Sequence, residues 1–166
     1  MSLQPQETER RAASSVLCGI LARVADLLRA DPAFAAPGTE IITEDKGDID
    51  TAIAQAVAAL GLCATVMLAD ARGAKESLPG PVFTSVGVVV EISENTLANR
   101  ASGGRTALEA AEEAARLLHL ARLPDGRTLT VTDLAKFPNP VEPADVCYHV
   151  IARLANVSLN RKVKTT

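Results

Sequence analysis

Aromatic side chains are nearly missing from this sequence. Its 166 residues include no Trp, one Tyr and three Phe, although 48% of the residues are hydrophobic. A core must therefore be built from Ala, Val, Leu and Ile. The same scarcity argues against a binding platform for single-stranded nucleic acid, because such platforms stack bases on aromatic faces.

A strong charge of either sign and a long apolar run are also missing. The net charge is −3 and the pI about 5.4, so we expect no general attraction to DNA and no sequence-specific nucleic-acid partner. No run reaches the ~18 apolar residues of a membrane span. The polar N-terminus has no apolar signal segment. We therefore expect a soluble intracellular protein with no membrane partner.

Cysteine pairs are absent as well. Cys18, Cys63 and Cys147 are far apart, odd in number and set in apolar runs, which favours buried free thiols in a reducing compartment. Without a CxxC pair, no zinc site of the usual spacing is encoded. The stretch EDKGDID at 44–50 lacks the residue order of a calcium loop. We expect no metal and no cofactor.

Apolar residues recur at three- and four-residue steps in three segments, which predicts three helices. The first spans about 7–30 and ends before Pro32; the second follows Asp48, a good N-cap, and ends at Gly61. The third is rich in alanine. It opens with Thr106 and has Glu109 three residues later, the spacing of a capping box.

The outer face of the third helix carries Glu112 and Arg116, which we expect to form an i,i+4 ion pair. Glu109, Glu112 and Glu113 are otherwise expected on a solvated helix face.

Strands are predicted at 62–69, 82–93, 128–134 and 145–156, with short strand character at 40–43. The loop of about ten residues at 72–81 favours an antiparallel pair for its two flanking strands. The prediction is one α+β domain over residues 1–166, with an antiparallel sheet of about four strands and two to three helices on one face. Residues 157–166 are expected to form a flexible basic tail.

The order of strand, Gly103-Gly104 and helix is also that of a phosphate-binding loop. A Walker loop needs GxxxxGK[ST], but Asn99 stands at the first glycine and Arg105 at the lysine. The commoner interpretation is that the two glycines let the chain turn into a capped helix. A small anion- or nucleotide-binding domain or enzyme remains the alternative, with Gly103, Gly104, Arg105 and Thr106 as its site.

The two histidines give little support to an enzyme. His119 lies near the end of the third helix, where a cation suits the helix dipole. His149 shares a strand face with Cys147 and Ile151. A catalytic Cys-His pair is conceivable there, but the apolar surroundings favour an inert thiol. Spacing alone assembles no Ser-His-Asp triad, so we expect no catalytic residues.

The polar stretch ENTLANR, residues 94–100, is more informative. A buried strand, a long valine strand ending in an acid, this stretch, a glycine turn and an alanine-rich helix carrying LLH follow one another. Over roughly residues 10–156, this order resembles the tail terminator and related minor tail proteins of long-tailed bacteriophages and prophages. The matching positions are Glu94, Asn95, Asn99, Arg100 and the turn Gly104-Arg105-Thr106, which departs from the family's plain Gly-Thr turn.

The resemblance implies a structural protein without catalysis. Such proteins form a ring, usually of six subunits, that caps the tail tube and presents a surface to head-completion or connector proteins. It places the protein in the virion tail, after synthesis in the bacterial host cytoplasm. It also implies a subunit or partner interface, for which the candidates are Glu94, Asn95, Asn99, Arg100 and Arg105. A general adaptor that forms no ring is a third hypothesis.

Overall fold

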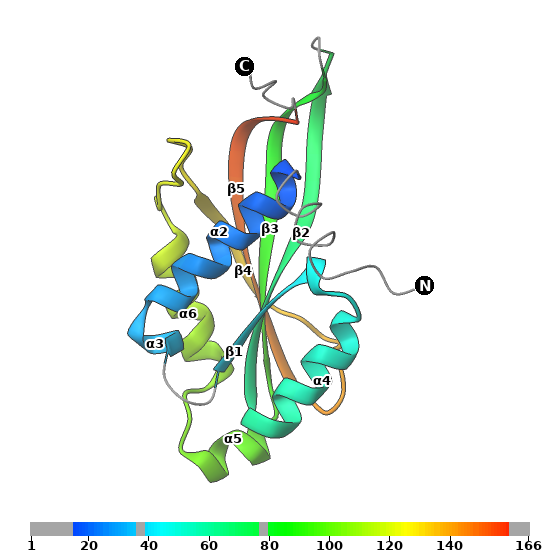
Figure 1. Ribbon diagram of the computed structural model, residues 1–166. Helices are drawn as coiled ribbons and strands as arrows, with labels where there is room; N and C mark the ends of the chain where they lie inside the picture. Colours follow the sequence, from blue (N-terminus) through cyan, green and yellow to red (C-terminus); the bar gives the residue numbers. More distant parts are fainter. Residues whose placement is uncertain (1–14, 36–38, 77–79, 160–166) are drawn as a thin grey trace, which may run out of the picture.

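A single five-stranded sheet organises the chain in the computed structural model, which describes residues 15–35, 39–76 and 80–159 (Figure 1). The strand order is β1-β2-β3-β5-β4. The strands are β1 (Thr39–Thr43), β2 (Leu62–Lys75), β3 (Val82–Glu94), β4 (Thr130–Lys136) and β5 (Val146–Ser158). The predicted α+β class is confirmed.

The four predicted strands pair antiparallel, as predicted, and the short β1 adds a fifth, parallel strand that makes the sheet mixed. β1 pairs in parallel with β2, and the other three pairings are antiparallel. β1 and β2 are parallel because the twelve-residue helix α4 (Ile49–Leu60) connects them. A crossover of this length returns the chain to the same end of the sheet, so the next strand runs in the same direction.

The larger core lies between one face of the sheet and two helices, α2 (Val16–Ala30) and α6 (Ala107–Leu118). Ser15 caps α2 by accepting the Cys18 amide, so this helix begins at residue 16 and not at 7; residues 7–14 lie outside the described part. The predicted stop before Pro32 is confirmed, although a short helix, α3 (Pro32–Ala35), follows directly. Small residues at 107, 110, 111 and 114 are fully buried and let α6 approach the sheet closely.

The opposite face of the sheet is covered by α4 at one end, which corrects the prediction that all helices share one face. Ile53, Ala56 and Val57 of α4 pack with Cys63 of β2 in a second, smaller cluster. Alternation explains the division: Leu62, Ala64 and Val66 point to the larger core, while Cys63 points to α4. Before α4, a 3-10 turn, η1 (Glu44–Lys46), follows β1.

Two strands, β2 and β5, extend further than the sequence predicted. β2 continues to Lys75, so the first four residues of the predicted loop 72–81 belong to a strand, and residues 77–79 are outside the described part. β5 reaches Ser158, with Val157 buried and paired with Phe83. The predicted tail at 157–166 therefore starts too early; residues 160–166 are not described.

Together with the start of β3, these extended ends of β2 and β5 project past the helices (Figure 1). We call the ends of these strands, residues 70–75, 82–87 and 153–158, the arm; Val86, Leu154 and Val157 on one of its faces are still buried in the larger core. β1 pairs with β2 only as far as Val66, and β4 pairs with β5 only as far as Arg153. Among the described residues, no strand covers the outer edge of β2 along the arm, or the outer edge of β5 beyond Arg153. No helix within the described ranges is long and apolar enough to cross a membrane.

Candidate functional site

The end of β3 holds a buried carboxylate that ties the strand to two helices. Glu94 is 4% exposed. Its Oε1 accepts a hydrogen bond from Asn99 Nδ2 at 2.7 Å, and its Oε2 accepts one from the backbone amide of Ala107 at 2.7 Å. Ala107 is the first residue of α6. A negative charge at this position is favourable, because the amides at a helix N-terminus carry partial positive charge.

Most of the polar stretch 94–100 belongs to a short helix, α5 (Thr96–Ser102), which the sequence did not predict. Asn95 caps it by accepting the Ala98 amide at 3.0 Å, and its Nδ2 donates to the carbonyl of Pro143 at 3.1 Å. Asn99 is buried inside the junction and also donates to the carbonyl of Arg105 at 2.7 Å. The short helix is therefore fixed to β3, to the loop before β5 and to the turn before α6.

The glycines of this region make room for Asn99. A Cβ at Gly104 would lie 2.1 Å from Asn99 Oδ1, and a Cβ at Gly61 would lie 2.7 Å from the Asn99 backbone nitrogen. Gly103 ends α5 with a positive φ of 68°. The Gly103-Gly104 pair thus serves a tight turn between two helices, as the commoner interpretation held.

The predicted capping box at the start of α6 is confirmed. Glu109 Oε2 accepts the Thr106 backbone amide at 2.9 Å, and Thr106 Oγ1 accepts the Glu109 amide at 3.3 Å. The amide and hydroxyl of Thr106 lower the pKa of the Glu109 carboxyl. Because Glu94 and Glu109 already bind the amides of residues 107 and 106, an anion at Gly103, Gly104, Arg105 and Thr106 would compete with two carboxylates. The structure therefore gives the alternative anion site no support.

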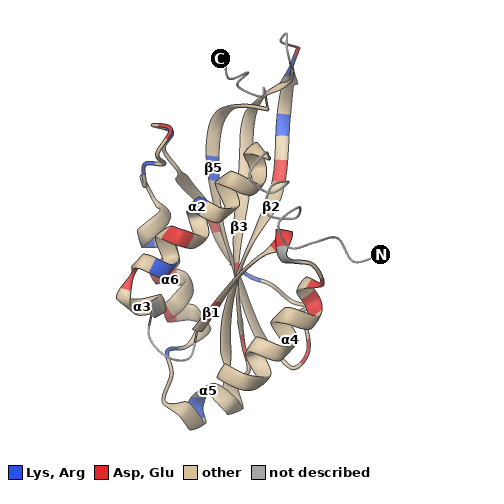
Figure 2. Cartoon of the chain, viewed as in Figure 1, with Lys and Arg blue, Asp and Glu red and all other residues tan. Residues whose placement is uncertain are grey.

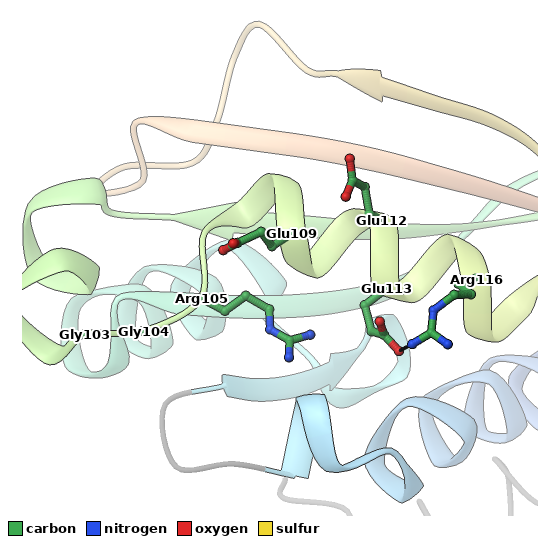
Figure 3. Close-up of a pocket in the computed structure, with 7 residues that line it drawn as sticks. All are labelled: Gly103, Gly104, Arg105, Glu109, Glu112, Glu113 and Arg116. Carbon is green, nitrogen blue, oxygen red and sulfur yellow. Dashed lines mark hydrogen bonds and ion pairs between the residues drawn. The ribbon is translucent and has the colours of Figure 1, made fainter.

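An open, charged groove runs along the exposed side of α6 (Figure 3). It has a volume of about 570 Å³ and is lined by Gly103, Gly104, Arg105, Glu109, Glu112, Glu113 and Arg116. Arg116 forms an ion pair with Glu113 and not, as predicted, with Glu112, which points away from it in Figure 3. Small-molecule pockets are typically enclosed and mostly apolar, whereas this groove is open and charged, as the rim of a protein contact is.

The five residues predicted at an interface separate into two groups. Glu94 and Asn99 are buried and use their polar atoms within the chain. Asn95 is half-buried, while Arg100 and Arg105 are exposed. Arg100 also acts within the chain: burial raises the pKa of Asp145, but hydrogen bonds from Thr96 and the charge of Arg100 outweigh burial, and the pKa is lowered.

The outer face of the arm carries an ion-pair network. Arg153 of β5 binds Asp70 of β2 through two hydrogen bonds of 2.7 and 3.0 Å that span β3, and Arg72 pairs with Asp70 at 2.8 Å. The hydrogen bonds from Arg153 lower the pKa of Asp70. Figure 2 shows charged residues of both signs where β2 and β5 project past the helices.

A second polar cluster lies on the face of the sheet that α4 covers at one end. His149 Nε2 and Glu91 Oε2 are 2.9 Å apart, and the His149 ring stacks on Phe137 with centroids 4.3 Å apart. Cys147 is fully buried beside them. The sequence placed Cys147 and His149 on one face, but it missed Glu91. Only the register of β3 against β5, which pairs Glu91 with His149, brings that carboxylate across.

The thiols behave as the sequence predicted at two of three positions. Cys63 and Cys147 are buried and unpaired, and Cys18 is half-buried. Burial raises the pKa of both Cys63 and Cys147 to about 12. These two thiols are therefore protonated at neutral pH, and neither is an activated nucleophile.

Comparison with known proteins gives a distant structural likeness. No family model matches the chain, and no curated protein matches it. Among solved structures, the fold is similar to a chain of a structure described as "Virion of native gene transfer agent (GTA) particle". The TM-score is 0.49 at 17% sequence identity, over 89% of this chain and 97% of that chain. We infer no function from a likeness of this degree.

Proposed function

We propose that this chain is a structural component of a phage-like virion: a tail terminator that forms a ring on the end of the tail tube. The observation that carries the proposal is the arm, whose two outer edges lie on opposite sides of β3, one on β2 and the other on β5. An uncovered strand edge is a template for pairing with another chain. Two different edges on one subunit suit a head-to-tail contact, which closes into a ring when the rotation between neighbours divides a full turn.

The resemblance of residues 94–106 to tail terminator proteins supports the same function. In the structure this segment is held rigid by the Glu94 and Asn99 hydrogen bonds, and it presents Arg100 and Arg105 at the surface. A rigid arginine is well suited to a carboxylate on a partner, because its planar fork donates two parallel hydrogen bonds. The proposed partners are a second copy of the chain, the tail tube protein and a head-completion or connector protein.

The proposal includes six subunits, a place in the virion tail and no catalysis. The alternative of an anion-binding domain or enzyme is not carried further, since carboxylates of the chain itself occupy the start of α6.

Sedimentation of the purified protein tests the ring. Wild type and Arg100→Ala are compared by analytical ultracentrifugation at matched concentration and salt, alone and with tail tube protein. Arg23→Ala is the matched control, because Arg23 is an exposed arginine on α2. We expect Arg100→Ala to lower the fraction of rings while the melting temperature of the isolated subunit stays the same.

Two outcomes would count against parts of the proposal. If Arg100→Ala forms rings as well as wild type and the control do, Arg100 is not an interface residue. If wild type forms no ring even with tail tube protein present, the tail-terminator function itself is excluded.

A further inference from the structure

We propose that Glu91, Cys147 and His149 form a binding site for a divalent transition metal ion, with Zn²⁺ as the best fit. One donor atom from each residue lies within 4.8 Å of the other two. Nothing in the ring proposal uses these residues, so the site stands or falls independently of it.

The backbone brings the three donors together. Cys147 and His149 are two residues apart on β5, so they share one face of the sheet. In the antiparallel register, Glu91 of β3 lies directly opposite His149, and Ser93 lies directly opposite Cys147. Side chains opposite each other on one face have Cβ atoms about 5 Å apart. The site therefore needs no rearrangement of loops, because two neighbouring strands hold all three donors.

The distances suit a tetrahedral ion. Zinc lies about 2.0–2.1 Å from nitrogen or oxygen and about 2.3 Å from sulfur, which puts tetrahedral ligands about 3.3–3.6 Å apart. His149 Nε2 and Glu91 Oε2 are 2.9 Å apart. An ion between them would widen this separation by a few tenths of an ångström. The thiol, within 4.8 Å of both atoms, would then move inward to complete three protein ligands.

Neighbouring groups already orient the donors. The single hydroxyl proton of Ser93 has two acceptors within reach, Glu91 Oε1 at 3.2 Å and Cys147 Sγ at 3.8 Å. Phe137 stacks on the His149 ring, and its backbone amide donates to the Cys147 carbonyl at 2.9 Å. Such outer contacts fix ligand geometry in metal sites.

The donor set selects the class of ion. Thiolate and imidazole favour zinc and other first-row transition metals, whereas Ca²⁺ and Mg²⁺ prefer oxygen ligands. A thiolate and a carboxylate together balance the charge of a divalent cation. Binding releases the thiol proton to solvent, because only the thiolate coordinates. The His149 side chain is 23% exposed, which leaves a route for the ion and a fourth position for water.

Cobalt(II) is the most direct probe, since a cobalt–thiolate bond gives a charge-transfer absorption band in the near ultraviolet. We expect wild type to bind one Co²⁺ with this band, and added Zn²⁺ to displace the cobalt and abolish the band. Zinc should also raise the melting temperature, because it binds only the folded site.

Variants identify the ligands. Cys147→Ser should remove the band, and His149→Gln and Glu91→Gln should each weaken zinc binding at least ten-fold. The matched controls Cys18→Ser and Cys63→Ser should keep both the band and the affinity. Circular dichroism confirms that each variant is folded before it is compared.

The wild-type spectrum tests the proposal even if every variant fails to fold. Absence of binding, or cobalt bound without a thiolate band, overturns it and leaves a hydrogen-bonded Glu91–His149 pair beside an inert thiol. A band that persists in Cys147→Ser but is lost in a control variant would place the metal elsewhere and would also overturn it.

Discussion

The side chain of Glu94 holds together the junction formed by residues 94–107. It was predicted as an interface residue, yet it lies inside the chain and accepts hydrogen bonds from Asn99 and Ala107. Its place follows from strand alternation: Val86, Val88, Val90 and Ile92 face the larger core, and Glu94 continues the same face to the start of α6. The buried carboxylate is thus a structural link between β3, α5 and α6.

Replacing this carboxylate should be costly. In Glu94→Gln an amide NH₂ group stands where two donors need acceptors, so one buried donor loses its partner. A hydrogen bond to a charged group is worth about 1.5–3 kcal/mol, and we expect the free energy of unfolding to fall by about 2 kcal/mol. Denaturant midpoints of wild type and variant measure this. Glu112→Gln, on the exposed side of α6, is the control, and an equal midpoint for all three proteins would refute the link.

The Asp70–Arg153 pair should make the arm sensitive to acid. Folding lowers the pKa of the Asp70 carboxyl. The stabilisation that Asp70 gives is therefore complete above its unfolded pKa of about 3.9, and it is lost as the pH falls through the folded pKa. Wild type should therefore be more stable than Asp70→Asn at neutral pH, with a difference that shrinks below about pH 4. Unfolding free energies of both proteins from pH 7 to pH 3 give the answer. A difference independent of pH would show that the charge of Asp70 is not what matters.

At the scale of elements, the capping box of α6 is the local feature that the sequence predicted in most detail. Thr106 and Glu109 form both of the hydrogen bonds that their spacing predicts. Loss of an N-cap side chain costs about 1 kcal/mol, and we expect Thr106→Ala to lower the unfolding free energy by that amount. Equilibrium denaturation at unchanged slope measures it, with Thr132→Ala on the exposed edge strand β4 as control. An unchanged midpoint for Thr106→Ala would contradict the capping role.

The sequence predicted the helices and strands whose buried apolar residues repeat at a regular interval, and it missed the elements without such a repeat. The valine strand β3, the helix α4 and the helix α6 were all identified, because their apolar residues repeat with the period of the element. The seven residues of α5 bury only Asn99, so no apolar period reveals them. The far half of β2 reads as a loop because its residues are exposed and polar. These residues form a strand because they pair with β3, and the local sequence does not reveal that pairing.

The candidate site was predictable to a similar degree. The sequence drew attention to the segment 94–106, since it has two asparagines and two glycines between a strand and a capped helix, and in the structure this segment joins β3, α5 and α6. Which side chains point inward was not predicted. Asn99 is buried because Gly61 and Gly104, 38 residues before it and five after it, leave space on either side. Such a contact depends on how α4 and α5 meet, and no local pattern records it.

For the molecule as a whole, the arm is the part that assembly should change most. Among the described residues no strand pairs with the outer edge of β2 beyond Val66 or of β5 beyond Arg153, so the backbone amides that point outward there have no partner strand within the described chain. If neighbouring subunits pair with these edges, hydrogen exchange at residues 70–75 and 153–158 should slow in the assembled ring relative to the monomer. Residues 88–92 of β3, flanked by two strands in the monomer, serve as the internal control. Equal exchange of the arm in both states would exclude edge pairing.

The fit of Asn99 between two glycines has a consequence for how this sequence can change over time. A side chain at position 104 would collide with the Asn99 amide, whereas one at position 61 would collide with the backbone of residue 99 and also hold a positive φ of 84°. Position 104 can therefore accept a larger residue once Asn99 has become smaller, but position 61 gains nothing from that replacement. Among related chains, residues 99 and 104 should vary together, while glycine at 61 should persist whatever stands at the other two.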